Sequence, residues 1–386
     1  MGLFRSLWSA VERQAAPSIV SKRNYFDFVD GLRGIAVLMV ILVHVSQSIG
    51  DGHYLSSSIQ TYVNAGARGV QLFFILSAFT LFSSNSRRAE NEERPLLRFY
   101  IRRAFRILPF WWVMAAVWLT YGVIHDHQLA LNSFFLAVTF LFGFSRFNLA
   151  LELIPGGWSL FVEETFYLIL PFITKRLKSL YDAIGATILL LILSIIWMKL
   201  RSKIPLFNQN NFAYLSPPTQ WFVFGLGIIG FFCIAHPRIR AVLLEKKMAL
   251  LIDTLTFTAL ALLIGEFYGS TIALFMLFLA SFSPFTLLGR LTRIPLLRLF
   301  GKYAYSLYLL QFIVLELLRP YSNLLSNTTI LSHLPYEVRL LIFYPLYCFM
   351  MLGLSALTFK FIELPCIEDG KKILRRLDSR RQTKSI

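Results

Sequence analysis

Long apolar runs recur along the whole of this 386-residue chain. Runs of about 18–20 residues are what a helix needs to cross the hydrocarbon core of a bilayer. The composition agrees, because 56% of the residues are hydrophobic and only 15% are charged, against about 25% charged in soluble domains. The short alternating segments typical of membrane β-barrels are not seen. The sequence therefore predicts an all-α, polytopic integral membrane helical bundle with about 10–11 transmembrane helices.

The order of apolar and basic segments predicts how the chain crosses the membrane. The candidate crossings are residues 34–49, 70–82, 107–124, 159–173, 184–198, 218–235, 249–264, 271–288, 303–318 and 339–361. Basic residues concentrate in alternate connections and at both ends, so we expect both termini to be cytoplasmic. One further apolar segment, 131–147, would reverse this pattern if it crossed. We therefore expect it to be re-entrant or tilted, buried in protein or beside a wet cavity.

Three parts of the chain follow from this pattern. We expect residues 1–25 to form a cytoplasmic or interfacial segment, residues 26–365 to form one membrane domain, and residues 366–386 to form a basic cytoplasmic tail. The net charge of +17 follows the positive-inside pattern, so we expect membrane lipids as partners and no nucleic acid. No cleavable signal peptide is expected. The three cysteines form no CxxC pair, so no metal site is predicted.

The first cluster that could carry chemistry is "DGLRGIAVLMVILVH". Arg33 and His44 are eleven positions apart, which places them on nearly the same face of a helix and roughly 16 Å apart along its axis. An ionisable group within a membrane span usually faces a cavity or a partner. A histidine there could act as a proton acceptor near neutral pH, or could simply be hydrogen-bonded to a neighbouring helix.

The second cluster is "FYIRRAFRILPFWW", in which Arg98, Arg102 and Arg106 follow one another at intervals of four, with Arg103 beside them. Such a set could bind a polyphosphate through charge-assisted hydrogen bonds. The alternative is ordinary anchoring of a basic loop to lipid headgroups.

The third cluster is "GGWSLFVEETFY". Ser159, Glu163 and Tyr167 share one helix face, whereas Glu164 is turned about 100° away. Glu163 is therefore the better candidate for a polar site. The alternative is a glutamate near a helix N-terminus that is stabilised there by the helix dipole.

Together these clusters resemble the acyltransferase-3 family, membrane O-acyltransferases that include bacterial O-antigen and other polysaccharide O-acetylases. The shared motifs are the arginine and histidine with ten residues between them in "LRGIAVLMVILVH", "FFILSA" at 73–78, "RAFRILP" at 103–109, "WSLFVEETFY" at 158–167, "YSLYL" at 305–309 and "FIELPCIEDGKK" at 361–372. The resemblance covers roughly residues 26–372. Two positions depart from the family pattern, since Ala78 stands in place of glycine and Gln311 in place of histidine. Glutamine cannot titrate, so a proton relay at that second position is not expected.

The resemblance implies that acyl-CoA, usually acetyl-CoA, donates an acyl group to a hydroxyl of a glycan or lipid-linked sugar at the bacterial inner membrane. His44 would take the role of the essential histidine, Glu163 that of the acidic residue, and Arg33, Arg103 and Arg106 that of the arginines on the CoA side.

These roles give a mechanistic hypothesis. His44 would remove the proton from the acceptor hydroxyl, while a covalent acyl-histidine stays open as a second route. Glu163 would orient the imidazole or bind the acceptor. Side chains that could bind substrate or stabilise the oxyanion are Ser77, Trp158, Ser159 and Tyr167. The competing functions are a multi-pass transporter or flippase and a subunit of an export complex, both without acyl transfer.

Overall fold

The computed structural model describes residues 27–49, 55, 57–89, 91–125, 131–144, 154–200, 203–204, 212–326 and 333–382. Within these ranges the regular structure is helical and there is no strand, which confirms the predicted all-α class. Residues 1–25, for which an interfacial segment was predicted, lie outside the described residues.

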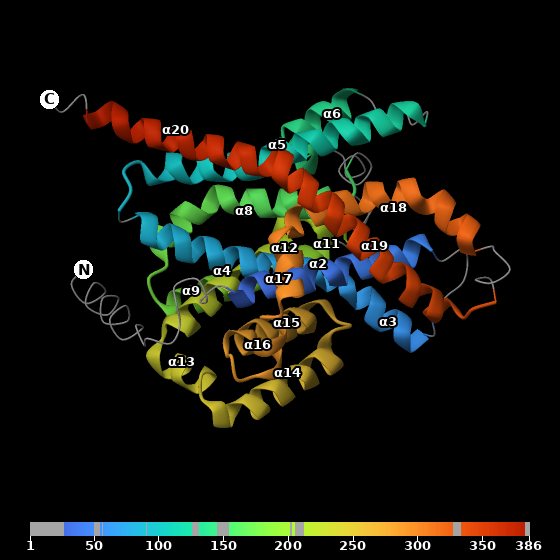
Figure 1. Ribbon diagram of the computed structural model, residues 1–386. Helices are drawn as coiled ribbons and strands as arrows, with labels where there is room; N and C mark the ends of the chain where they lie inside the picture. The colour runs from blue at the N-terminus through green and yellow to red at the C-terminus, as the bar shows by residue number, and fades with distance from the viewer. Residues whose placement is uncertain are drawn as a thin grey trace.

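The main helices coincide with the predicted apolar runs (Figure 1). They are α2 (Asp27–Ser48), α4 (Gly69–Ala89), α5 (Pro95–Ile124), α8 (Gly157–Arg176), α9 (Leu180–Leu200), α12 (Pro217–Ala235), α14 (Ala249–Leu263), α15 (Phe267–Phe282), α18 (Ala304–Ser326), α19 (Tyr336–Thr358) and α20 (Leu364–Gln382). The shorter elements are α3 (Ser57–Ala65), η1 (Gly66–Arg68), α6 (Leu131–Val138), η2 (Leu141–Phe144), α11 (Phe212–Leu215), α13 (Pro237–Leu243), η4 (Lys246–Met248), α16 (Leu287–Leu291), α17 (Pro295–Lys302) and η5 (Phe359–Glu363).

Length and composition separate these helices into two groups. Among the described residues, 6 helices are long and apolar enough to cross a membrane: those that contain α2, α4, α5, α9, α12 and α19. Of the other predicted crossings, α14 and α15 are shorter than 18 residues, whereas α8 and α18 are long enough but more polar. The chain is thus a multi-pass membrane protein whose polar helices are α8 and α18.

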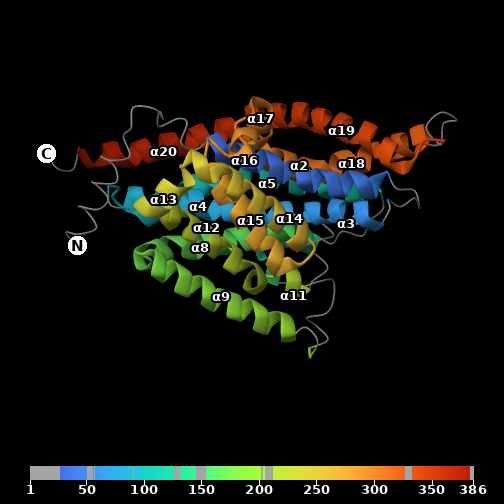
Figure 2. The same cartoon turned by 90° about the horizontal axis from the view of Figure 1, so that it is seen from below.

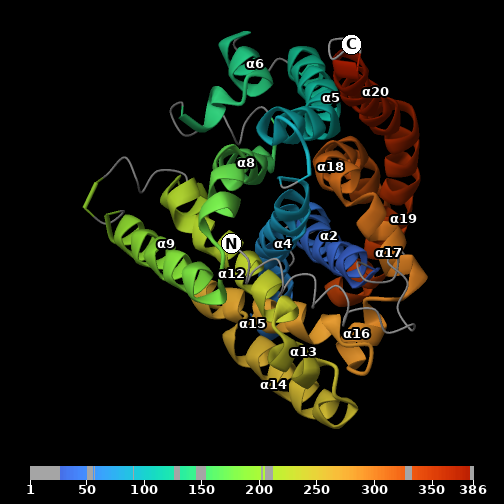
Figure 3. The same cartoon turned by 90° about the vertical axis from the view of Figure 1, so that its left-hand side faces the viewer.

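Helices α2 and α4 lie at the centre of the bundle when it is viewed along the helices (Figure 3). Two glycines allow the backbones around α2 to approach closely. A Cβ atom on Gly69 of α4 would lie 2.4 Å from the carbonyl oxygen of Ala36. A Cβ atom on Gly34 of α2 would lie 2.0 Å from the carbonyl oxygen of Leu297 in α17. Because no side chain fits at either contact, the positions of α4 and α17 are tied to that of α2.

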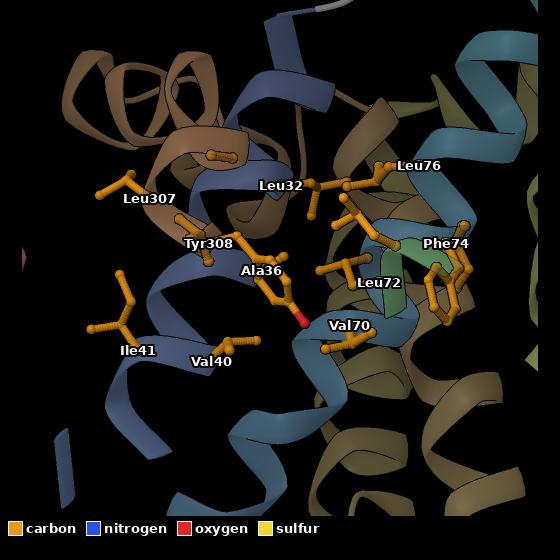
Figure 4. Close-up of a cluster of buried hydrophobic side chains, with 14 of the residues drawn as sticks. Leu32, Ala36, Val40, Ile41, Val70, Leu72, Phe74, Leu76, Leu307 and Tyr308 are labelled. Atoms are coloured by element: carbon orange, nitrogen blue, oxygen red, sulfur yellow. The ribbon is translucent and has the colours of Figure 1, made fainter. Parts of the chain in front are cut away.

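A buried apolar cluster joins α2, α4 and α18 (Figure 4). Its labelled members are Leu32, Ala36, Val40 and Ile41 from α2, Val70, Leu72, Phe74 and Leu76 from α4, and Leu307 and Tyr308 from α18. Helix α9 lies at the outer edge instead (Figure 2), and only 17% of its most apolar stretch is buried. Its apolar residues therefore face the surroundings, as expected for a helix in contact with lipid.

Basic residues gather at one end of the bundle, on the left of Figure 1. This basic end is formed by the last turns of α4 and α8, the first turns of α5, and α13 and α20, with Arg87, Arg88, Arg98, Lys175, Arg176, Arg238, Arg240, Lys371, Lys372, Arg375 and Arg376. Helices α3 and α6 lie at the opposite end (Figure 1). Basic segments that are far apart in the sequence thus lie at one end of the bundle, whereas α16 and α17 lie nearer its middle (Figure 1).

The segment predicted to be re-entrant is described as far as residue 144. It consists of the 8-residue helix α6 and the 4-residue helix η2, both too short to cross a bilayer. Two tryptophans of α5 hold the end of α6: the indole N–H of Trp111 donates to the carbonyl of Ala137 at 2.8 Å, and that of Trp112 donates to the carbonyl of Val138 at 3.1 Å. Helix α6 is therefore fastened to the side of α5.

Candidate functional site

A cavity of about 870 Å³, part of it open to solvent, lies between the helices at the centre of the bundle. Helices α2, α4, α5, α8 and α18 and the end of α17 contribute its walls. The lining residues are Arg33, Val70, Phe73, Phe74, Ser77, Thr80, Leu81, Arg103, Arg106, Ile107, Ser159, Leu160, Glu163, Tyr167, Gly301, Lys302, Ala304, Tyr305 and Tyr308. The two polar helices α8 and α18 thus direct their polar residues into the cavity.

The structure brings most of the predicted site residues together here. Those that line the cavity are Arg33, Ser77, Arg103, Arg106, Ser159, Glu163 and Tyr167. His44, Arg102 and Trp158 are not among the lining residues. Glu163 therefore shares the cavity with three of the predicted arginines, whereas His44 does not line it.

Glu163 is the centre of a hydrogen-bonded cluster on one wall. Its carboxylate oxygen accepts a hydrogen bond from Ser77 at 2.5 Å and another from Tyr167. The two hydroxyls are themselves 2.5 Å apart, and both side chains are buried. The Arg103 guanidinium lies over the Tyr167 ring, 5.8 Å from its centroid. Because both hydroxyls are oriented by the carboxylate, this wall presents a fixed polar surface beside a cation.

The cavity is strongly cationic. Arg33, Arg103, Arg106 and Lys302 line it, against the single carboxylate of Glu163. Arg33 donates to Asp30 at 3.3 Å and to Thr80 at 3.3 Å. Arg103 and Arg106 have no carboxylate within ion-pair distance in the part of the chain that the structure describes. Four cations that converge on a cavity with one carboxylate are suited to an anionic ligand.

The other arginines of α5 are bound within the protein. Arg98 pairs with Asp378 of α20, so it ties the start of α5 to the C-terminal helix. Arg102 donates from one guanidinium nitrogen to both carboxylate oxygens of Glu92, at 3.0 and 2.9 Å. Arg102 and Arg103 are adjacent in the second sequence cluster, but only Arg103 lines the cavity.

A second hydrogen-bonded group contributes Ser159 and Tyr308 to the cavity wall. Ser159 donates to the carbonyl of Gly156 at 3.0 Å and lies 2.7 Å from the hydroxyl of Tyr308. Tyr308 in turn donates to the same carbonyl at 3.1 Å. Gly156 has φ of 79°, a left-handed conformation that favours glycine, so its carbonyl can turn towards both hydroxyls.

His44 lies outside the cavity lining. Its ring is 4.5 Å from that of Phe312, measured between centroids, and its Nδ1 is 3.3 Å from the side-chain oxygen of Gln47. His44 is half-buried, whereas Gln47 is exposed. Trp158 turns to another neighbourhood, with Phe74 and Tyr214 as its ring partners. The histidine thus has a polar neighbour on its exposed side and an aromatic ring on its inner side.

Some cavity residues were not predicted. Lys302 lies in the connection between the predicted crossings 271–288 and 303–318, and nothing in the sequence pattern singles out Thr80. Tyr305 and Tyr308 belong to "YSLYL", where their spacing of three could have indicated a shared helix face. Gln311, which replaces the family histidine, is fully buried and donates to the carbonyl of Tyr308 at 2.9 Å. It therefore braces α18 and does not line the cavity.

Metal binding is not indicated in the described ranges, where no group of three or more His, Cys, Asp or Glu side chains could hold an ion.

Comparison with known proteins agrees with the motifs. The acyltransferase domain family matches residues 26–360. The O-acetyltransferase OatA of Staphylococcus aureus (strain NCTC 8325 / PS 47) is 24% identical over 377 residues, which cover 90% of this chain and 58% of the relative. The peptidoglycan O-acetyltransferase OatA of Listeria monocytogenes is 26% identical over 380 residues, which cover 90% of this chain and 57% of the relative.

The chain therefore spans less than three fifths of the length of these curated relatives. No solved structure matches it. The family match extends over nearly the whole described bundle and includes all the residues that line the cavity. The protein is thus a member of the acyltransferase domain family.

Proposed function

We propose that this protein is a membrane O-acetyltransferase. It takes an acetyl group from acetyl-CoA held in the cavity and transfers it to a hydroxyl of a cell-surface glycan or lipid-linked sugar. In this proposal the protein lies in the bacterial inner membrane with the basic end and both termini in the cytoplasm, where the donor is available. The family and the names of the relatives support the reaction class.

The observation that carries the proposal is the charge of the cavity. Four cationic side chains converge on it, and Arg103 and Arg106 have no carboxylate partner among the described residues. Leaving cations uncompensated inside a bundle is costly unless a ligand supplies the opposite charge. The phosphates of CoA have that charge, and arginine matches phosphate geometry.

The length of the cavity suits a long donor. Its lining on α4 runs from Val70 to Leu81, eleven residues or about 16 Å along the helix. The nucleotide end of CoA would lie among the arginines near the basic end. The pantetheine arm would then bring the thioester past Glu163 towards Ser159 and Tyr308.

The chemistry is the attack of an acceptor hydroxyl oxygen on the thioester carbonyl carbon. A C–O bond forms, the C–S bond breaks, and the CoA thiolate leaves. His44 takes the hydroxyl proton as general base. The protons of Ser77 and Tyr167 are committed to Glu163, so Glu163 acts as a positioning residue for this wall.

The test is acetyl transfer by the purified protein in lipid nanodiscs. Acetyl-CoA labelled in the acetyl group is supplied with candidate glycans, and labelled ester is measured. We expect transfer by the wild type and its loss in His44→Ala, while His125→Ala, an exposed histidine near the end of α5, retains activity. A transporter or an export subunit would give no label in any acceptor, and equal rates in the two variants would remove His44 from the mechanism.

A further inference from the structure

We propose that Phe312 decides whether the acyl group goes to the acceptor or to water, because its ring separates the donor cavity from His44. This inference rests on the proposed function and goes beyond it by assigning a selectivity role to a residue outside the cavity. Phe312 is a positioning residue in this proposal, since it touches the base and not the reacting atoms.

The separation consists of two layers. The first is the group formed by Ser159, Tyr308 and Gly156, which is joined by hydrogen bonds of 2.7 to 3.1 Å and contributes Ser159 and Tyr308 to the cavity wall. The second is the ring of Phe312. A Cβ atom on Gly156 would lie 2.7 Å from Phe312 Cε2 and 3.1 Å from the Tyr308 hydroxyl, so the ring packs directly on the outer side of the first layer.

His44 lies directly behind this ring. The centroids of the imidazole and of Phe312 are 4.5 Å apart, with an interplanar angle of 56°. Phe312 is thus in contact with the glycine on one side and with the base on the other. Tyr308 of the first layer and Phe312 are four residues apart on α18, so these two side chains lie on the same face of that helix.

This arrangement has a chemical consequence. Thioester hydrolysis and acyl transfer use the same steps: an oxygen attacks the carbonyl carbon, the C–S bond breaks, and the proton of the attacking water or hydroxyl passes to the base. Water competes with the acceptor whenever a base and the thioester share an open space. With Phe312 between them, the base meets the thioester only after the ring moves. Binding of the bulky acceptor beside His44, next to exposed Gln47, supplies the contact that moves it.

The experiment measures CoA release from acetyl-CoA with a thiol reagent, with and without acceptor, in nanodiscs. We expect Phe312→Ala to raise acceptor-independent release about tenfold or more, since general-base assistance to water can reach far beyond that factor. Phe312→Leu, which keeps an apolar barrier, stays near the wild type. Phe343→Ala, a buried phenylalanine of α19 outside the cavity, controls for a general loosening of the bundle.

A second measurement does not depend on catalysis. In a Cys366→Ser background, His44→Cys is treated with a membrane-impermeant thiol reagent from each side of sealed vesicles. We expect labelling from the side opposite the basic end only, and labelling from both sides once Phe312→Ala is added. Unchanged sidedness together with unchanged hydrolysis in Phe312→Ala would overturn this inference. A wild type that transfers no acetyl group would instead overturn the proposed function, while the sidedness of labelling would still decide on the barrier.

Discussion

Two arginines one turn apart on α5 allow a direct test of the proposed donor site. Arg106 lines the cavity and has no carboxylate partner among the described residues, whereas Arg102 is held by Glu92 and points away from it. Both have the same charge and lie one helical turn apart on the same helix. We predict that Arg106→Ala weakens the binding of acetyl-CoA and that Arg102→Ala does not.

The size of the effect follows from the contact that is lost. A hydrogen bond to a charged group contributes about 1.5–3 kcal/mol. The Arg106 side chain is exposed, so water screens its charge and the lower part of this range applies. A loss of about 1.5–2 kcal/mol corresponds to a roughly 10–30-fold rise in Kd. Arg102→Ala removes an ion pair between half-buried groups that contacts no ligand, so it changes thermal stability and leaves Kd within about twofold of the wild type.

The assay is equilibrium binding of acetyl-CoA, or of a non-reactive thioether analogue, to the purified protein. Arg106→Lys keeps the charge but not the planar donor set, and its Kd should lie between those of the wild type and Arg106→Ala. The reasoning fails if Arg102→Ala weakens binding as much as Arg106→Ala does. It fails equally if Arg106→Ala binds with the affinity of the wild type.

Three further predictions concern catalysis and packing. Glu163→Gln removes the charge that orients two hydroxyls, so kcat should fall about 10²-fold with little change in the Kd of acetyl-CoA; a change in Kd alone would contradict a positioning role. Asp253→Ala leaves the backbone N–H of Leu287 without its 2.6 Å partner at the start of α16, which should cost about 1–3 kcal/mol and lower the midpoint of thermal unfolding. Gly34→Ala places a methyl group 2.0 Å from the Leu297 carbonyl oxygen, so we expect α17 to shift and both folded yield and donor affinity to fall. Normal yield of that variant would show that α17 is not fixed by this contact.

The helices could be predicted well because membrane burial acts on each segment by itself. Apolar runs predicted at 218–235 and 249–264 match α12 and α14 to within one residue at each end. The basic cytoplasmic tail predicted at 366–386 remains a prediction. The helical stretch from Tyr336 continues through residue 366 to Asp378, and hydropathy alone does not reveal that α20 packs along α5.

The site could be predicted only where one helix determines it. Helical periodicity predicted that Glu163 and Tyr167 lie on one face and that Glu164 points elsewhere. In the structure Glu163 and Tyr167 are hydrogen-bonded and Glu164 does not line the cavity. The same periodicity placed Arg33 and His44 on one stripe of α2, yet only Arg33 lines the cavity. His44 instead packs against the ring of Phe312, which belongs to α18 and lies 268 residues further along the chain. Such contacts depend on how helices pack and leave no periodic signal in the sequence.

Helices α8 and α18 show how the fold accommodates polar groups at membrane depth. They are long enough to span but are not among the helices apolar enough to do so, and each directs tyrosine side chains into the cavity. Serine and tyrosine hydroxyls can satisfy one another there, as Ser159 and Tyr308 do, so their cost is largely offset within the bundle. The unpaired guanidinium groups of Arg103 and Arg106 cannot be satisfied in this way. In the proposed function these two cations attract the phosphates of the donor to the cavity.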